Sequence, residues 1–193
     1  MLTTASLRQR NEQQIHAQIM ALGPISRKKL VELTGLTGAA ISRITRDMIT
    51  DGILIEGDGA VESGRLGRRE VELSANPDFR YVLGLTITGN RRSMVLSNSV
   101  GDVVREADIT GVDISDPTRG LNDIADAAKG LIFEAGIRKS DVAGVGVSMP
   151  LSASRSEGLV TAPPINWIDV PVQGILTSSL GLPVKIEARP TSI

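Results

Sequence analysis

The sequence predicts a protein of two parts, a helical unit ending in a hairpin over residues 1–75 and an α/β domain over residues 80–193. In the first part, apolar residues recur at helical spacing, and two short extended pieces follow them. In the second part, strand-like and helical segments come in the order β-β-β-α-β-α-β, which is typical of an α/β domain. The segment "SANPDF" is the expected boundary.

Composition narrows the classes of function. The chain has 193 residues, a formal net charge of −1, no cysteine and one histidine, His16. Disulfides, thiolate catalysis and cysteine-based zinc sites are therefore excluded, and we expect no metal and no cofactor. Neither a signal peptide nor an apolar run of about 20 residues is present, so we expect a cytoplasmic protein without a membrane partner.

The first predicted helix, "NEQQIHAQIMAL", ends before Gly23 and Pro24. Its apolar residues Ile15, Ile19 and Leu22 fall on one face at helical spacing.

The second predicted helix is "RKKLVELT", for which Ser26 is a plausible N-cap. Its apolar residues Leu30, Val31 and Leu33 are expected to face a partner helix. Gly35 closes the helix, because glycine adopts the left-handed conformation that helix ends require.

The third predicted helix begins after Thr37, which is placed to cap it. Ile41, Ile44 and Met48 share one face and must point into the bundle. At about 100° per residue, the opposite face is small at one end and basic beyond it. That face carries Ala39, Ser42, Arg43 and Arg46.

Two extended pieces, "LIEGD" and "REVELSA", follow the third helix and suggest a hairpin. The segment between them, "GAVESGRLGR", is rich in glycine and arginine. Arg65, Arg68 and Arg69 fall within five positions at this tip or directly after it.

Helix, short turn, basic helix and hairpin together make a winged helix-turn-helix, a DNA-binding arrangement. Ser42, Arg43 and Arg46 could reach base edges or phosphates, and small Ala39 allows close approach. Thr37 and the positive end of the helix dipole suit a phosphate. The arginines at the tip could enter a minor groove. The alternatives are a helical bundle that packs against a neighbour and a solvated turn.

In the second part, Asp116 and Pro117 are expected to open the long helix, as N-cap and first helical residue. A buried strand, a loop rich in proline and serine, a short helix and a last strand follow. The predicted strands are 81–87, 93–98, 102–109, 142–150 and 183–187, and the predicted helices are 116–137 and 172–181.

Four stretches of the chain resemble transcriptional regulators of the ROK family (repressors, open reading frames and kinases). They are "GPISRKKLVELTGLTGAAISRITRDMITDGILIE", "SGRLGRREVELSANP", "YVLGLTI" and "GVGVSMPLSASRSEGLVTAPPINWIDVPVQGILTSSLGLPVKIE", which cover almost the whole chain in the family's order. The first block is common to many winged-helix proteins, and the last is much more specific.

The resemblance implies a winged helix-turn-helix followed by the first lobe of an actin- and ribonuclease H-like sugar-kinase domain, truncated before its second lobe. It also implies a repressor of sugar-related genes that binds a double-stranded DNA operator as a homodimer or higher oligomer. A sugar effector is implied too, although one lobe alone cannot complete the sugar cleft.

Departures from the family's kinases argue against an enzyme. Thr86 stands where the family's kinases carry an aspartate for ATP phosphates. After Glu187, Ala188 and Arg189 replace the asparagine and the catalytic aspartate of those kinases, and an arginine cannot accept a proton. A sugar kinase is therefore disfavoured.

Asn166 and Glu187 are the ligand-binding candidates, because the resemblance places their segments near the sugar. A structural alternative for the first segment is that Trp167 caps the core while Asn166 shapes a turn. For the whole chain, a protein-interaction module and the remnant of a truncated regulator stay open as alternatives to the DNA-binding regulator.

Overall fold

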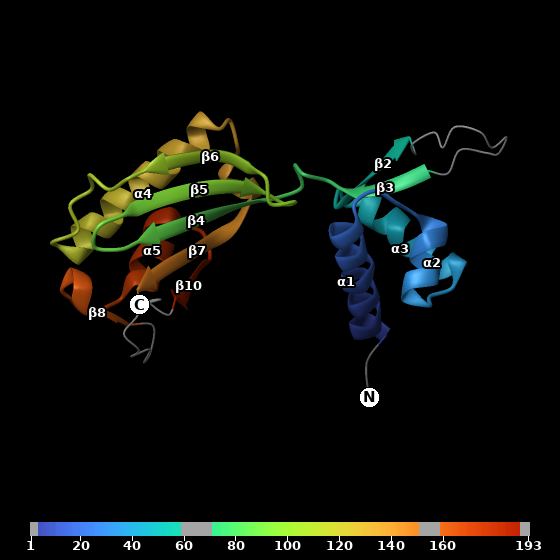
Figure 1. Ribbon diagram of the computed structural model, residues 1–193, viewed down its shortest axis with the longest axis horizontal. Coiled ribbons are helices and arrows are strands. Elements are labelled where there is room, and N and C mark those ends of the chain that lie inside the picture. Colours follow the sequence, from blue (N-terminus) through green and yellow to red (C-terminus); the bar gives the residue numbers. More distant parts are fainter. Residues whose placement is uncertain (1–3, 59–70, 151–158, 190–193) are drawn as a thin grey trace. The chain divides into compact units, whose positions relative to one another are not determined.

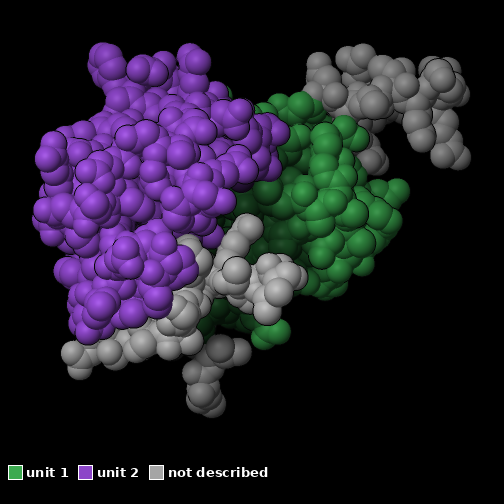
Figure 2. Space-filling model, turned by 60° about the vertical axis from the view of Figure 1, so that its left-hand side comes forward, with its two compact units in different colours: residues 1–79 green, residues 80–193 purple. Residues whose placement is uncertain are grey.

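The computed structural model describes residues 4–58, 71–150 and 159–189. The chain divides into two compact units, residues 1–79 and residues 80–193, which Figure 2 colours separately. Each unit has its own hydrophobic core.

In its described residues, the first unit contains three helices and a three-stranded antiparallel sheet with the strand order β1-β3-β2. Figure 1 shows the three helices with β2 and β3. This is the topology of a winged helix-turn-helix, as the sequence predicts. Its elements are α1 (Thr4–Leu22), β1 (Ile25–Ser26), α2 (Arg27–Thr34), α3 (Gly38–Thr50), β2 (Leu54–Asp58) and β3 (Val71–Ala75).

The core of the first unit confirms most of the predicted helix faces, but Leu33, which was expected to face a partner helix, is exposed. Leu22 is 56% exposed and Leu33 is 40% exposed. Leu22 is the last residue of α1, directly before Gly23 turns the chain with a φ of 76°. In α2 the buried stripe runs between Leu30 and Val31, and at about 100° per residue Leu33 lies on nearly the opposite side of the helix from Val31. The predicted core residues that are buried are Ile15, Ile19, Leu30, Ile41, Ile44 and Met48.

Two features of the first unit differ from the prediction. Helix α1 begins at Thr4 rather than at residue 11, through a polar segment that an i, i+4 ion pair between Arg8 and Glu12 supports. Strand β1 was not predicted, because two residues are too short to show a periodicity. Its residues Ile25 and Ser26 pair with Leu73 and Glu72 of β3.

The second unit is built on a five-stranded sheet with the strand order β10-β7-β4-β5-β6. Neighbouring strands in β4-β5-β6 are antiparallel, whereas β7 runs parallel to both β4 and β10. An antiparallel meander extended by parallel strands is the arrangement of the ribonuclease H-like lobe that the resemblance implies. The strands are β4 (Tyr81–Ile87), β5 (Arg92–Asn98), β6 (Val103–Asp108), β7 (Val142–Pro150) and β10 (Val184–Arg189).

The predicted element order of the second unit is confirmed, with one addition. A small antiparallel pair, β8 (Val160–Ala162) and β9 (Trp167–Val170), lies in the segment that was expected to be a loop. Two short 3-10 turns, η1 (Lys139–Asp141) and η2 (Pro163–Ile165), precede β7 and β9 respectively.

Helices α4 (Pro117–Glu134) and α5 (Val172–Leu180) pack on each other and on one face of the sheet. Asp116 caps α4 by accepting hydrogen bonds from the backbone N–H groups of Thr118 and Arg119, so the predicted helix start is confirmed. Along β4, Leu83, Leu85 and Ile87 are buried in the core beneath the helices.

The other face of this sheet is lined by small residues. A hollow of about 310 Å³ lies over the middle of β4, β5 and β7. Side chains alternate between faces along a strand, so these residues point away from the core. They include Gly84, Thr86, Ser93, Val95, Gly146 and Ser148.

Among the described parts of the chain, no helix is long and apolar enough to cross a membrane.

Candidate nucleic-acid interface

The turn between α2 and α3 is fixed by side-chain and backbone hydrogen bonds. Gly35 ends α2 in the left-handed conformation, with a φ of 69°, and donates its N–H to the carbonyl of Val31 at 3.0 Å. The Thr34 hydroxyl donates to the Leu30 carbonyl at 2.6 Å and accepts from the Leu36 N–H at 3.3 Å. This tight connection holds the two helices at a fixed angle.

Both predicted N-caps are confirmed. The Ser26 side chain accepts a hydrogen bond from the N–H of Lys29, and the Thr37 side chain accepts one from the N–H of Ala40, each at 3.3 Å. Each cap satisfies one backbone donor at a helix N-terminus. The N-terminus of α3 is exposed, and the helix dipole gives it a partial positive charge.

The outer face of α3 carries the residues that the sequence analysis proposed as DNA contacts. Thr37, Ala39, Arg43 and Arg46 are exposed, and Ser42 is half-buried. They share one side of the helix because the core residues of α3 occupy the other side. The structure therefore brings these five residues together on one accessible surface.

The electrostatics of α3 favour an anion on this surface. Its one acidic residue within the helix, Asp47, accepts a 3.0 Å ion pair from Arg8 of α1. The pKa of Arg8 is raised above its usual range, first by its hydrogen bond to Glu12 and then by attraction to Glu12 and Asp47. Across the described ranges, neither Arg43 nor Arg46 has a carboxylate within ion-pair distance.

Arg27 connects the helix-turn-helix to the hairpin. Its Nε donates to the Thr45 hydroxyl of α3 at 3.1 Å, and its Nη2 donates to the Glu56 carboxylate of β2 at 2.7 Å. Thr45 is fully buried and donates its own hydroxyl hydrogen to the Ile41 carbonyl at 2.9 Å. The start of α2, the middle of α3 and the first hairpin strand are thus tied at one point.

The arginines of the hairpin tip, Arg65, Arg68 and Arg69, lie outside the described residues. The strands that lead into and out of this segment, β2 and β3, are where the sequence predicts them. A contact between the tip and DNA stays a prediction.

Sequence analysis did not single out Arg27 and Lys28 as functional residues. Lys28 is exposed at the N-terminal end of α2, next to Arg27. The signal was visible as "RKK", three cations directly after the N-cap Ser26. The tie that Arg27 makes could not be found in the sequence, because Thr45 and Glu56 are 18 and 29 residues away from it.

In the second unit, the two ligand-binding candidates come from different elements of the fold. Asn166 is exposed and adopts the left-handed conformation, with a φ of 56°, directly before β9. Glu187 lies in β10, where its backbone is paired in register with Ser148 of β7. Trp167 is fully buried and donates its Nε1 hydrogen to the Ile114 carbonyl at 2.9 Å. These observations favour the structural account of Asn166 and Trp167.

Two observations bear on phosphate and metal chemistry. Thr86 is a half-buried residue of β4, paired with Ser93 and Ser148 of the neighbouring strands, and it brings no carboxylate to the sheet. Within the described ranges, no group of three histidine, aspartate or glutamate side chains lies close enough to hold a metal ion.

Comparison with known proteins indicates the class to which this architecture corresponds. No family model matches the chain. A crystal structure of a ROK family transcriptional regulator, a homologue of the E. coli MLC protein, superposes with a TM-score of 0.66. The two sequences are 24% identical. The matched region is 93% of this chain and 45% of the regulator's chain. This structure supports the fold of both units.

Curated sequences extend the likeness to particular regulators. The putative xylose repressor of Caldicellulosiruptor sp. is 28% identical over 184 residues, which are 95% of this chain and 46% of the relative. The xylose repressor of Bacillus subtilis is 24% identical over 92% of this chain and 45% of its own length. The resemblance to ROK transcriptional regulators is thereby confirmed, and the chain spans about half the length of these relatives.

Proposed function

We propose that the protein is a DNA-binding transcriptional repressor of the ROK type that acts on sugar-related genes. The observation that carries this proposal is the outer face of α3, where Arg43 and Arg46 are exposed and have no carboxylate partner among the described residues. A helix of this kind, directly after a short fixed turn, fits the major groove of DNA.

Each residue of the interface has a distinct role in this proposal. Ala39 lets the helix approach the base edges closely, and Arg43 and Arg46 donate to bases or to phosphates. Thr37 and the free N–H groups at the start of α3 bind a backbone phosphate. Ser42, half-buried, lies between the arginines and the core and contacts the groove wall.

The hairpin supplies a second contact. Arg65, Arg68 and Arg69 would bind the minor groove or the backbone beside the recognition helix. A palindromic operator would be bound by two copies of the chain, because two-fold symmetry in the protein matches two-fold symmetry in the DNA. We place this activity in the cytoplasm, where the operator is.

For the effector, we propose only a chemical class of ligand. The relatives are named for repression linked to xylose, so a pentose or another small sugar is the ligand class to test. Asn166 and Glu187 stay the candidate contacts in the second unit. The proposal includes no enzymatic activity, because Thr86 and Arg189 replace the acidic residues on which phosphoryl transfer would depend.

A titration of the 193-residue chain against DNA from its own upstream region tests the function. It is done at 50 mM and 200 mM salt, with random DNA of equal length as the control. We expect preference for the upstream DNA and a steep loss of affinity at the higher salt, because binding releases counterions. Adding D-xylose tests the effector separately.

Other outcomes would point elsewhere. Equal affinity for both DNAs, with the fold intact by circular dichroism, would contradict a sequence-specific repressor. Absence of any DNA binding would favour the alternative of a protein-interaction module.

A further inference from the structure

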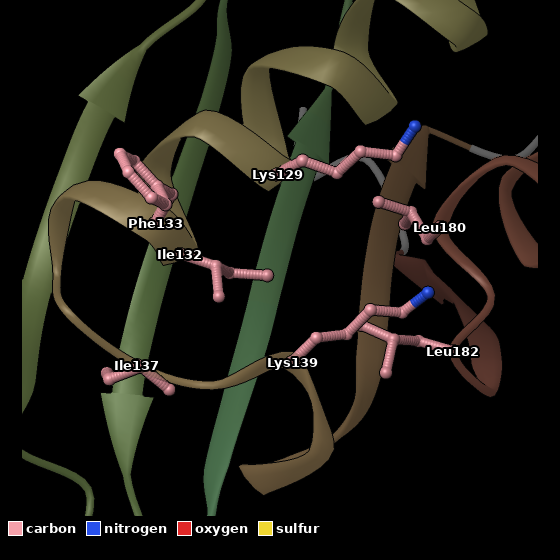
Figure 3. A pocket seen from close by; sticks show the side chains of 7 residues that line it. All are labelled: Lys129, Ile132, Phe133, Ile137, Lys139, Leu180 and Leu182. Atoms are coloured by element: carbon pink, nitrogen blue, oxygen red, sulfur yellow. The ribbon is translucent and has the colours of Figure 1, made fainter.

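A second surface of the molecule, in residues 80–193, has no role in the proposed function. It is a hollow of about 190 Å³ between the C-terminal end of α4 and the C-terminal end of α5 (Figure 3). The residues that line it come from three separate segments of the chain. They are Lys129, Ile132, Phe133, Ile137, Lys139, Leu180 and Leu182.

The floor of the hollow is apolar and its rim carries an exposed aromatic ring. Ile132, Leu180 and Leu182 are buried core residues that line it. Phe133, on the next position of α4, is 84% exposed. The chain has only two phenylalanines. An exposed ring beside an apolar hollow is typical of a surface that another molecule covers.

Two lysines frame the hollow. In Figure 3 the amines of Lys129 and Lys139 both extend toward the side of Leu180 and Leu182. The Lys139 amine lies over Gly181, only 2.6 Å from where a Cβ atom on that glycine would be. Within the described ranges Lys139 has no carboxylate at ion-pair distance. Lys129 pairs with Asp126 at 2.8 Å, but both side chains are about half exposed or more.

Acidic residues of the same helix complete the pattern. Glu134 directly follows Phe133 and is exposed, and Asp126 is exposed about two turns earlier. The end of α4 therefore presents an aromatic ring, an apolar hollow, positive charges and negative charges within one small area. A surface with both halves of each complementary pair can bind a copy of itself across a two-fold axis.

We propose that this surface, the Phe133 surface, joins two copies of the chain. The Phe133 ring of each copy enters the hollow of the other, and Glu134 of each copy faces the Lys139 amine of the other. Every contact is then made twice. The rings supply the affinity through burial of apolar area, while the charges fix the orientation and exclude other arrangements.

The choice of a second copy over a foreign acidic partner rests on these charges. A surface that bound only an acidic segment would need its lysines and its apolar floor, but not an exposed aromatic ring next to a glutamate. The two-fold contact uses all four elements. It does not depend on the DNA-binding proposal, because α4 belongs to the other unit.

Sedimentation velocity of the 193-residue chain, without DNA, over a hundredfold range of concentration tests this surface. We expect a reversible dimer whose dissociation constant rises at least tenfold in Phe133→Ser. The matched control is Ile168→Ser, because Ile168 is an apolar residue of the same unit and is 75% exposed. This variant should dimerise as the unaltered chain does, and circular dichroism verifies that both variants fold.

Charge reversal distinguishes the two-fold contact from a general loss of affinity. Glu134→Lys and Lys139→Glu should each weaken the dimer, and the double variant should restore it. An unaltered chain that stays monomeric at every concentration would overturn the proposal. So would a dimer that is insensitive to Phe133→Ser, or a double variant that stays as weak as the single ones.

Discussion

The Nε atom of Arg27 donates a hydrogen bond of 3.1 Å to the hydroxyl of Thr45, a side chain that is completely buried within α3. A buried hydroxyl needs its hydrogen-bonding groups satisfied, and Thr45 achieves this with Arg27 on one side and the Ile41 carbonyl on the other. Since Arg27 also forms an ion pair with Glu56 of β2, it fixes the position of α3 relative to the hairpin.

Replacing Arg27 with alanine should therefore affect both stability and DNA binding. We expect a loss of about 1 kcal/mol in the free energy of unfolding for a hydrogen bond to a buried group. Operator affinity should fall as well, because α3 and the hairpin would no longer be held together. Urea denaturation and a DNA titration measure the two effects.

Lys29→Ala is the matched control for Arg27→Ala. Lys29 lies on the same helix and pairs with Glu32, but both side chains are about half exposed. An exposed pair of this kind contributes at most about 1 kcal/mol and often much less. Equal effects of the two substitutions would show that Arg27 acts only through its charge.

Arg43→Ala and Arg46→Ala test the recognition surface directly. If either side chain contacts a base, its removal should cost about 1 to 3 kcal/mol of binding free energy and relax the preference at that base pair. If it contacts a phosphate, affinity should fall for all sequences and the salt dependence should become shallower. Arg10→Ala, an exposed arginine of α1, controls for the loss of one positive charge. Unchanged operator affinity would remove the residue from the interface.

Thr37 has two proposed roles that substitutions can separate. Thr37→Ala removes the cap of α3 and should lower the free energy of unfolding by about 1 kcal/mol. Thr37→Asp keeps a capping oxygen and should leave stability nearly unchanged, but its negative charge should repel a phosphate. We expect the aspartate variant to be as stable as the unaltered chain and to bind DNA more weakly. Full DNA affinity in this variant would exclude a phosphate at the start of α3.

Two glycines of α4 should respond in opposite directions to alanine. A Cβ atom on Gly120 would lie 2.7 Å from the Asp113 carbonyl oxygen and 2.9 Å from the Ile114 Cα, so Gly120→Ala must displace backbone and destabilise the second unit. A Cβ atom on Gly130 meets nothing within 4 Å. Gly130→Ala should raise the free energy of unfolding by up to about 1 kcal/mol, because alanine favours the helix. Thermal unfolding of both variants measures the contrast.

The sequence predicted features that depend on short-range chemistry. Ser26, Thr37 and Asp116 were predicted as N-caps because their side chains suit that role, and each accepts the expected backbone hydrogen bond. The apolar spacing of α3 placed its core face correctly, so the opposite face that carries Arg43 and Arg46 followed from geometry alone.

Features that depend on residues far apart along the chain could not be predicted from the sequence. Leu33 has the same chemistry as Leu30, and only the position of the neighbouring helices leaves one exposed and the other buried. Strand β1 exists because β3 offers it a partner about 47 residues away in the chain. The Phe133 surface likewise depends on packing, since Leu180 at the end of α5 and Leu182 directly after it reach it from a distant part of the chain.

The short strand β1 has a mechanical consequence. Ser26 is paired through its backbone with Glu72 of β3, while its side chain caps α2. A single residue thus belongs to both the sheet and the helix, and β3, with neighbours on both sides, is the middle strand. A force applied at the hairpin travels along β3 to the first turn of α2. The backbone amides of β3 and α2 should therefore exchange with deuterium at similar rates, because the two elements open together as one cooperative unit.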